Sequence, residues 1–291
     1  MSVGSAFPPE LWVGIAFVFG LVVGSFLNVV IHRVPLGESI VRPGSRCPAC
    51  GRPVTPLENV PVLSYLWLRG RCRGCRGRIS PRYPAIELAT GIAFAAVAMR
   101  YGATPMTPVL CAFAAALIAA AMIDFDHHLI PDEISLGGLV VALLLVPPVR
   151  SLAGGAFLDE MFRSFAGAAV GAFLLWSVGF VHARIAAAMG RRFEHWPGDG
   201  EDFPRPASAD FWLWFPGMGL GDVKLLAMIG AVLGPIGVVE TIIVASVAGL
   251  VSGFAWALAS RSLSAPFGFG PAIAAGALIV VLVPHAMLFV G

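Results

Sequence analysis

The chain is poor in charged residues, and this shortage excludes an ordinary soluble domain. Only 12% of its 291 residues are Asp, Glu, Lys or Arg, whereas soluble domains carry about 25%. Hydrophobic residues make up 58% of the chain, and the mean hydropathy is +0.85. The formal net charge is only +2, so the placement of the charges says more than their sum. The composition is typical of a protein that crosses a membrane several times, and we expect no nucleic acid as a partner.

The signatures of several other protein classes are also missing. The run Gly217–Asp222 is rich in glycine, but it has neither the Lys-Ser/Thr ending of a phosphate-binding loop nor a preceding strand. No pattern suggests a Ser-His-Asp or Cys-His nucleophile, and we detect no inverted repeat of the transporter kind. The N-terminus lacks a basic segment before its first apolar run, so we do not expect a cleavable signal peptide.

Eight apolar runs predict eight membrane spans, because roughly 17–25 apolar residues cross a bilayer as a helix. The runs are Leu11–Ile31, Ala85–Met99, Val109–Ile123, Ile134–Val149, Phe165–Ala188, Val223–Leu233, Val238–Leu258 and Phe269–Phe289. The sixth run is the shortest, and Gly234 with Pro235 predicts a tight turn into the seventh. We therefore expect an all-α polytopic membrane protein with about eight transmembrane helices.

Arginine is concentrated in one loop, and this sets the expected orientation. Segment 33–82 contains ten arginines and two acids. Short loops rich in Lys and Arg stay in the cytosol, so the loop is predicted to be cytosolic and the N-terminus external. Counting spans onward places 16 of the 19 basic residues on the cytosolic side. Asp124 and Asp222 then both lie at cytosolic ends of spans.

Four of the five cysteines form two Cys-x-x-Cys pairs in that loop, Cys47 with Cys50 and Cys72 with Cys75. The 21 residues between the pairs match the spacing of two zinc knuckles. Cytosolic thiols stay reduced, which argues against disulfides and leaves redox-active dithiols as the alternative. Four thiolates fill the coordination sphere of zinc, so the predicted metal is structural and holds a small loop domain together.

The surroundings of the cysteines carry two further expectations. Gly51, Gly74 and Gly77 are expected to ease the tight turns, and the flanking arginines to favour thiolates. Cys111 lies inside an apolar span, so we expect an ordinary buried side chain there.

Two aspartates stand where a membrane protein rarely tolerates charge. Asp124 ends the apolar run 111–123, and Asp222 opens the run after Gly217–Gly221. A carboxylate at the centre of a membrane helix costs on the order of 3 kcal/mol, so an ionisable group kept there predicts a functional site. If the two carboxylates meet, they share one proton and can activate water for attack on a peptide carbonyl. For Asp222, the alternative is a helix N-cap after a Gly-rich turn.

The acids and histidines beside Asp124 have simpler interpretations. Asp132 follows Pro131 and is predicted to be the N-cap of the next span, and Glu133 suits the helix N-terminus electrostatically. Asp126, His127 and His128 are interpreted as solvated groups at the membrane interface, with Asp126 facing away from Asp124.

An ordered set of motifs resembles the bacterial type IV prepilin peptidase family over nearly the whole chain. The motifs are Gly24–Pro35, the two cysteine pairs, Ser80–Leu88, Asp124–Asp132, Gly217–Leu225 and Phe269–Gly276. The resemblance implies a membrane-embedded aspartic protease with Asp124 and Asp222 as its catalytic residues. It also implies removal of the short basic leader of a prepilin or pseudopilin in the same membrane. The resemblance further implies that the new N-terminus is then methylated with S-adenosylmethionine as the methyl donor.

The remaining expectations follow from this resemblance and from the charge pattern. The protein is expected in the bacterial inner membrane with its active site facing the cytosol. The expected domains are a first helix (1–34), a zinc-binding loop associated with methyl transfer (35–83) and a peptidase core (84–291). Asn28, Arg33 and Glu87 are candidates for the methyl-donor site. For Glu87, a charge that faces solvent or Arg82 is an equal alternative.

One segment departs from the family, and two other functions stay open. The loop from Gly190 to Pro216 is longer than the family's connector, and its Trp212 and Trp214 suit a membrane interface. A transporter would use the aspartates as ion sites, whereas a membrane adaptor would use the zinc loop to bind a partner and the aspartates as helix caps.

Overall fold

The structure, a computed structural model, describes residues 8–191, 205–213, 219–260 and 268–283, in which helices are joined by turns and by irregular segments such as most of 37–81. Within these ranges there is no strand, which confirms the all-α prediction. The long helices are α1 (Pro9–Arg33), α3 (Arg82–Tyr101), α4 (Met106–His127), α5 (Asp132–Ser151), α6 (Phe157–Ala188), α8 (Leu220–Ser260) and α9 (Gly270–Leu282). The short ones are η1 (Val34–Leu36), η2 (Pro56–Asn59), α2 (Leu63–Trp67) and α7 (Ala209–Leu213).

The long helices lie at the positions that the apolar runs predicted. By length and composition alone, five described helices can cross a membrane, namely α1, α4, α5, α6 and α8. Helix α3 and the described part of α9 fall outside that set. Because α8 contains two of the predicted runs, seven runs lie within helices, and α9 covers the eighth from Gly270 to Leu282. The end of the last run, residues 284–289, lies outside the described residues.

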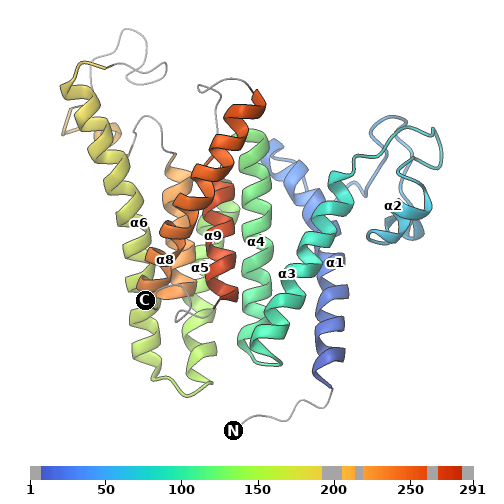
Figure 1. Ribbon diagram of the computed structural model, residues 1–291, viewed down its shortest axis with the longest axis horizontal. Helices are drawn as coiled ribbons and strands as arrows, with labels where there is room; N and C mark the ends of the chain where they lie inside the picture. Colours follow the sequence, from blue (N-terminus) through green and yellow to red (C-terminus); the bar gives the residue numbers. More distant parts are fainter. Residues whose placement is uncertain (1–7, 192–204, 214–218, 261–267, 284–291) are drawn as a thin grey trace. The chain divides into compact units, whose positions relative to one another are not determined.

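Helix α8 is folded back on itself at Gly234, as the sequence predicted. Gly234 has φ 79° and ψ 177°, and Pro235 follows it. A Cβ built on Gly230 would lie 2.9 Å from Cγ2 of Val238, although a straight helix separates such positions by about 12 Å. The lighter and darker orange halves of α8 therefore form a helical hairpin (Figure 1).

Arginines hold this hairpin from the neighbouring helices. Arg150 of α5 donates a hydrogen bond to the Val232 carbonyl at 2.6 Å and lies 3.5 Å from the Glu160 carboxylate. The Arg163 side chain covers Gly234, since a Cβ there would come within 2.8 Å of its Nε. The turn is thus anchored by charged groups.

The chain divides into two compact units, residues 1–127 with 278–291 and residues 128–277. In the first unit α1 packs along α3, and both contact α4. In the second unit α6 and α5 pack on α8 and on each other.

Glycine pairs allow the closest helix contacts in both units. In α1, Gly20 and Gly24 form a G-x-x-x-G pair, which is typical of tightly packed membrane helices. A Cβ on Gly24 would lie 2.6 Å from Cα of Glu87 in α3. In α6, a Cβ on Gly167 or Gly171 would collide with backbone carbonyls of α8. The helices therefore touch along their backbones.

Replacing Gly24 by valine should separate α1 from α3. We expect a loss of about 1–3 kcal/mol, because the new side chain would meet backbone atoms that cannot move aside. The thermal unfolding midpoint of the purified protein in detergent measures this loss. Gly14→Val is the matched control on the same helix, since nothing lies within 4 Å of a Cβ there. Equal midpoints for the two variants would contradict the packing argument.

Candidate functional sites: a four-cysteine centre and two aspartate motifs

The four loop cysteines come together in the first unit, as their spacing predicted. Their sulfur atoms all lie within 4.8 Å of one another, and Sγ of Cys47 and Sγ of Cys75 are 3.9 Å apart. Zn–S bonds of about 2.3 Å place tetrahedral sulfurs roughly 3.8 Å apart, so the four thiolates fit zinc. No disulfide joins the described cysteines, and Cys111 is buried in α4 as expected.

Each cysteine pair is held by the same tight turn. The N–H of Cys47 donates to Arg52 O at 2.9 Å and that of Gly51 donates to Cys47 O at 2.8 Å. In the second turn Cys72 N–H donates to Gly77 O at 2.8 Å and Arg76 N–H to Cys72 O at 3.0 Å. The two turns are therefore two copies of one zinc knuckle.

The positive backbone angle in each knuckle falls on equivalent residues, Gly51 (φ 70°) and Arg76 (φ 60°). The expectation that glycine eases the turns is met at Gly51. In the second knuckle a non-glycine residue, Arg76, has the left-handed conformation instead, and neither Gly74 nor Gly77 does. The position of a residue in the knuckle turn, rather than whether it is glycine, therefore determines which residue has the left-handed conformation.

Backbone N–H groups, more than arginines, tune the sulfur charges. The N–H groups of Cys75 and Gly74 lower the pKa of Cys72 to about 6, with a smaller contribution from Cys47. At Cys50 the N–H of Arg52 lowers the pKa, but the Cys47 thiol, desolvation and the other two thiols together raise it to about 11. Sulfurs this close carry negative charge together only when a cation lies among them.

The acid Glu58 links the two knuckles. Its carboxylate accepts hydrogen bonds from Arg52 at 3.0 Å and from the Thr55 N–H at 3.1 Å, and it lies 3.6 Å from Arg73. The Thr55 N–H, followed by Arg52, lowers the pKa of Glu58. Because Arg52 follows the first cysteine pair and Arg73 lies within the second, this carboxylate holds the loop together next to the sulfurs.

Asp124 lies in the last turn of α4, which continues to His127. Only 6% of Asp124 is exposed, and the adjacent Ile123 is fully buried. Asp126 faces elsewhere and is exposed, as predicted, and it also forms an ion pair. Arg82 at the start of α3 donates two hydrogen bonds to its carboxylate, at 2.7 and 2.5 Å. The sequence did not predict this ion pair, which forms because α3 begins beside the end of α4.

Asp222 lies in the first turn of α8, which begins at Leu220. It is half-buried and its N–H donates to Gly219 O at 3.2 Å. Asp222 is thus inside the helix rather than its N-cap, which corrects the capping alternative. Gly217 and Met218 lie outside the described residues, so the glycine run is described only from Gly219 onward.

Asp132 is also inside a helix rather than its cap. Pro131 occupies the N-cap position of α5, and Asp132 is the first helical residue. Its carboxylate accepts a hydrogen bond from Nζ of Lys224 at 2.6 Å. The N-cap prediction was wrong because an extended proline precedes the helix, while Lys224 binds the carboxylate. This contact places the start of α5 next to the start of α8 within the second unit.

Comparison with known proteins agrees with these motifs. Residues 18–101 match the bacterial Peptidase A24 N-terminal domain and residues 111–254 match the type IV leader peptidase family. Prepilin leader peptidase/N-methyltransferase of Aeromonas hydrophila is 33% identical over 94% of this chain and 91% of its own length. The chain belongs to the type IV leader peptidase family. The Bacillus subtilis protein of the same name is 34% identical over 92% of this chain and 93% of its own.

A third family member, from Myxococcus xanthus, is 40% identical over 84% of this chain, but the chain spans only 63% of that protein. No solved structure matches the chain. The transporter and adaptor alternatives find no support in these comparisons.

The three candidates for the methyl-donor site in this leader peptidase family member make structural contacts: Asn28 joins α1 to the start of α3, and Arg33 and Glu87 hold the loop. Asn28 donates to the Tyr83 carbonyl at 3.1 Å, and Arg33 donates to the Ser39 carbonyl at 2.9 Å. Glu87 is buried, and its carboxylate accepts a hydrogen bond from the Val62 N–H at 2.7 Å. The solvent-facing interpretation of Glu87 was therefore wrong, whereas a role of the three in cofactor binding stays a prediction.

Sequence reasoning missed one buried acid and only partly described the long loop. Glu240 is 2% exposed in the second half of α8, and a lone acid inside an apolar run is the signal that could have found it. Trp212 stacks on Trp176 and Phe180 of α6 at 6.4 and 5.4 Å between ring centroids. Trp214 and most of the loop's acids and prolines lie outside the described residues.

Proposed function

We propose that this protein is a membrane aspartic endopeptidase that removes the leader of type IV prepilins or pseudopilins and then methylates the new N-terminus. The observation that carries the proposal is membership of the type IV leader peptidase family across 111–254, a range that includes both aspartate motifs. Relatives that this chain covers almost completely are named prepilin leader peptidase/N-methyltransferase. The substrate lies in the same membrane.

The catalytic residues in this proposal are Asp124 and Asp222. Asp124 is buried at the end of α4, and Asp222 is half-buried at the start of α8. When the two carboxylates approach, they share one proton, because like charges that close do not both stay ionised. The ionised carboxylate takes a proton from water, whose oxygen attacks the scissile carbonyl carbon. The protonated carboxyl gives its proton to the carbonyl oxygen, and collapse of the tetrahedral intermediate breaks the C–N bond and releases the amine.

Two ion pairs support the helix ends that carry these aspartates. Arg82 with Asp126 fixes the end of α4 against α3, and Lys224 with Asp132 fixes the start of α8 against α5. We assign both pairs a positioning role, since each holds a backbone segment within two residues of a proposed catalytic carboxylate.

Removing Arg82 should slow the reaction without preventing folding. Exposed ion pairs contribute at most about 1 kcal/mol to stability, but a shifted α4 end should lower kcat about tenfold with little change in KM, because positioning of a catalytic group is lost. The variant Arg82→Gln tests this by prepilin cleavage kinetics. The double variant Arg82→Asp, Asp126→Arg should recover most of the kcat. A double variant no faster than the single one would contradict the positioning role.

The four cysteines hold a structural zinc in this proposal, because four thiolates leave no position for a catalytic water. The methyl donor is S-adenosylmethionine, which supplies the methyl group as a sulfonium when bound. Asn28, Arg33 and Glu87 are the proposed residues for that site: the Glu87 carboxylate would attract a cationic group, and Arg33 a carboxylate.

We place the active site on the cytosolic side of the bacterial inner membrane. The support is the ten arginines of segment 33–82, together with the Arg82–Asp126 pair, which places the end of α4 on the same side as that loop. The proposed functional division into 1–34, 35–83 and 84–291 separates the first helix, the zinc loop and the peptidase core.

One incubation tests both activities. Purified protein in detergent is mixed with a prepilin and S-adenosylmethionine labelled in its methyl group. We expect a smaller pilin that carries the label. No size shift would overturn the peptidase proposal, and a size shift without label would overturn the methyltransferase half alone.

A further inference from the structure

Helix α2 exposes its apolar side chains and turns its polar ones inward. Leu63, Leu66 and Trp67 are 65%, 64% and 77% exposed, whereas Ser64 and Tyr65 are partly covered. The spacing i, i+3, i+4 places the three exposed side chains on one face of the helix. Such an exposed apolar face marks a contact site for an apolar surface such as a membrane.

The depth of α2 is fixed by the hydrogen bond from Val62 to Glu87. Val62 immediately precedes α2, and Glu87 lies five residues after Arg82, the first residue of α3. At 1.5 Å per residue, this is roughly 7 Å along α3 from its loop end. Figure 1 accordingly shows α2 level with the N-terminal half of α3 rather than beyond its end. Helix α2 therefore lies beside α3, at the level where the predicted span 85–99 begins.

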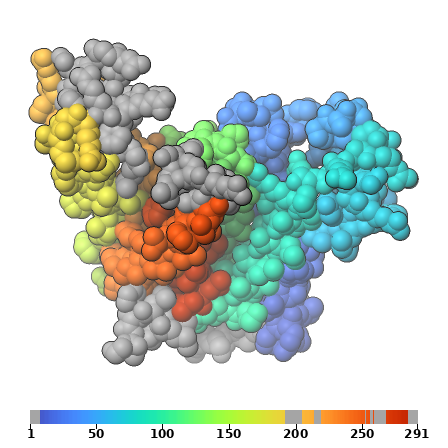
Figure 2. Space-filling model, turned by 45° about the horizontal axis from the view of Figure 1, so that its top comes forward, coloured from blue at the N-terminus to red at the C-terminus, as the bar shows by residue number. Residues whose placement is uncertain are grey.

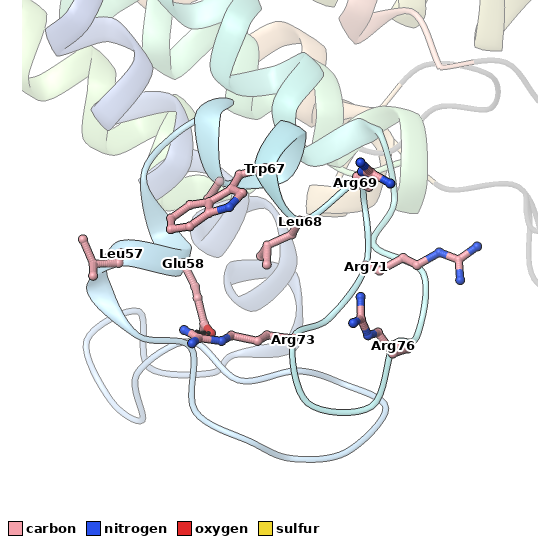
Figure 3. Close-up of a pocket in the computed structure, with 9 residues that line it drawn as sticks. Leu57, Glu58, Trp67, Leu68, Arg69, Arg71, Arg73 and Arg76 are labelled. Atoms are coloured by element: carbon pink, nitrogen blue, oxygen red, sulfur yellow. Dashed lines mark ion pairs between the residues drawn. The ribbon is translucent and has the colours of Figure 1, made fainter.

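An arginine-rich cavity opens next to the same face. It has a volume of about 720 Å³, and its lining includes Trp67, Leu57, Arg69, Arg71, Arg73 and Arg76. Figure 3 shows Trp67 and Leu57 on one side of the cavity and Arg69, Arg71 and Arg76 on the other. Glu58 also lines it, but its carboxylate is already bound to Arg52. Among the described residues, no carboxylate forms an ion pair with Arg69, Arg71 or Arg76.

The chemistry of this cavity selects an anionic and partly apolar ligand. Arginine is the side chain best suited to phosphate oxygens, and tryptophan prefers the level of the lipid headgroups. S-adenosylmethionine has a cationic sulfonium and a net positive charge, so four arginines would repel it. An anionic phospholipid combines the phosphate with acyl chains that the α2 face can cover.

We propose that the zinc loop docks on the membrane through α2, with anionic phospholipid headgroups bound in the arginine cavity. Leu63, Leu66 and Trp67 enter the interface, while Arg69, Arg71 and Arg76 bind lipid phosphates. Figure 2 shows the loop as a lobe that projects beside the start of α3, which leaves this lobe free to meet the bilayer surface around the helix. The proposal goes beyond peptide cleavage and does not depend on it.

Hydrogen exchange of the full-length protein in lipid nanodiscs tests the docking. The backbone amides of 63–76 should exchange more slowly in nanodiscs that contain phosphatidylglycerol than in nanodiscs of phosphatidylcholine alone. The exchange rate should fall about fivefold for each arginine that binds a lipid phosphate. High salt should reverse much of this protection, because it screens charges at the surface. The variant Arg69→Gln, Arg71→Gln should lose the difference between the two lipids. The matched control is the double variant Arg42→Gln, Arg46→Gln, which removes two loop arginines outside the cavity. This control should still exchange more slowly with phosphatidylglycerol than with phosphatidylcholine alone.

Two further arms separate the possible sources of the protection. The triple variant Leu63→Ser, Leu66→Ser, Trp67→Ser should lose its protection from exchange in both lipids. Its zinc content, which reports folding of the loop, should stay at the wild-type level. Inorganic phosphate added to phosphatidylcholine nanodiscs should have no effect. Equal exchange in the two lipids would overturn the proposal, as would phosphate that reproduces the effect of phosphatidylglycerol.

Discussion

Changing either Asp124 or Asp222 to asparagine should reduce prepilin cleavage at least ~1,000-fold, because residues that act as a catalytic unit are close to indispensable. Asparagine keeps the shape of the side chain but cannot exchange the proton that the proposed dyad would move between water and the scissile carbonyl. The protein should still accumulate and unfold at nearly the wild-type temperature. Cleavage is measured as the size shift of a purified prepilin.

The control for these variants is Asp159→Asn. Asp159 is an exposed acid in the first turn of α6, so its substitution should leave cleavage at the wild-type rate. A substrate that is already cut provides a second control, because its free N-terminus should still be methylated by both asparagine variants. Normal cleavage by both variants would rule out the aspartate dyad, and loss of methylation on the cut substrate would indicate a folding defect instead.

Removing two of the zinc ligands should unfold the loop between α1 and α3. Binding of structural zinc to small cysteine sites contributes about 10–16 kcal/mol at neutral pH, which such loops need in order to fold. In the variant Cys47→Ser, Cys72→Ser one ligand is lost from each knuckle. We expect bound zinc to fall from about one per chain to near zero and segment 34–81 to become sensitive to protease. Metal analysis and limited proteolysis measure the two effects.

Cys111→Ser is the matched cysteine control. Cys111 is buried in α4 and takes no part in the cluster, so its substitution should leave zinc content unchanged. Wild-type zinc content in the double variant would contradict the four-cysteine site.

Features set by short stretches of sequence were predictable. The zinc knuckles depend on a Cys-x-x-Cys spacing that closes one turn, and both form as expected. The helix positions follow from apolar runs, and the hairpin in α8 follows from Gly234 and Pro235. In each case the physical cause lies within a few residues of its effect.

Features set by side chains reaching between helices were not predictable. The pair Arg82–Asp126 joins residues 44 apart, and Lys224–Asp132 joins residues 92 apart. Without knowing which helix ends meet, the sequence could offer only solvated or capping roles for these acids. The approach of Asp124 to Asp222 stays a prediction, since each lies in a different compact unit.

The hairpin in α8 has a consequence for where hydrolysis takes place. Asp222 is twelve residues before Gly234, which is about 18 Å along a helix, while the hydrocarbon layer is about 30 Å thick. If the hairpin turn that the arginines bind lies at the outer surface of the hydrocarbon layer, Asp222 lies within that layer and does not reach its inner surface. With Asp222 as a catalytic residue, as proposed, the reacting water would have to reach it below the headgroups, and the substrate would have to bring its cleavage point down to that depth.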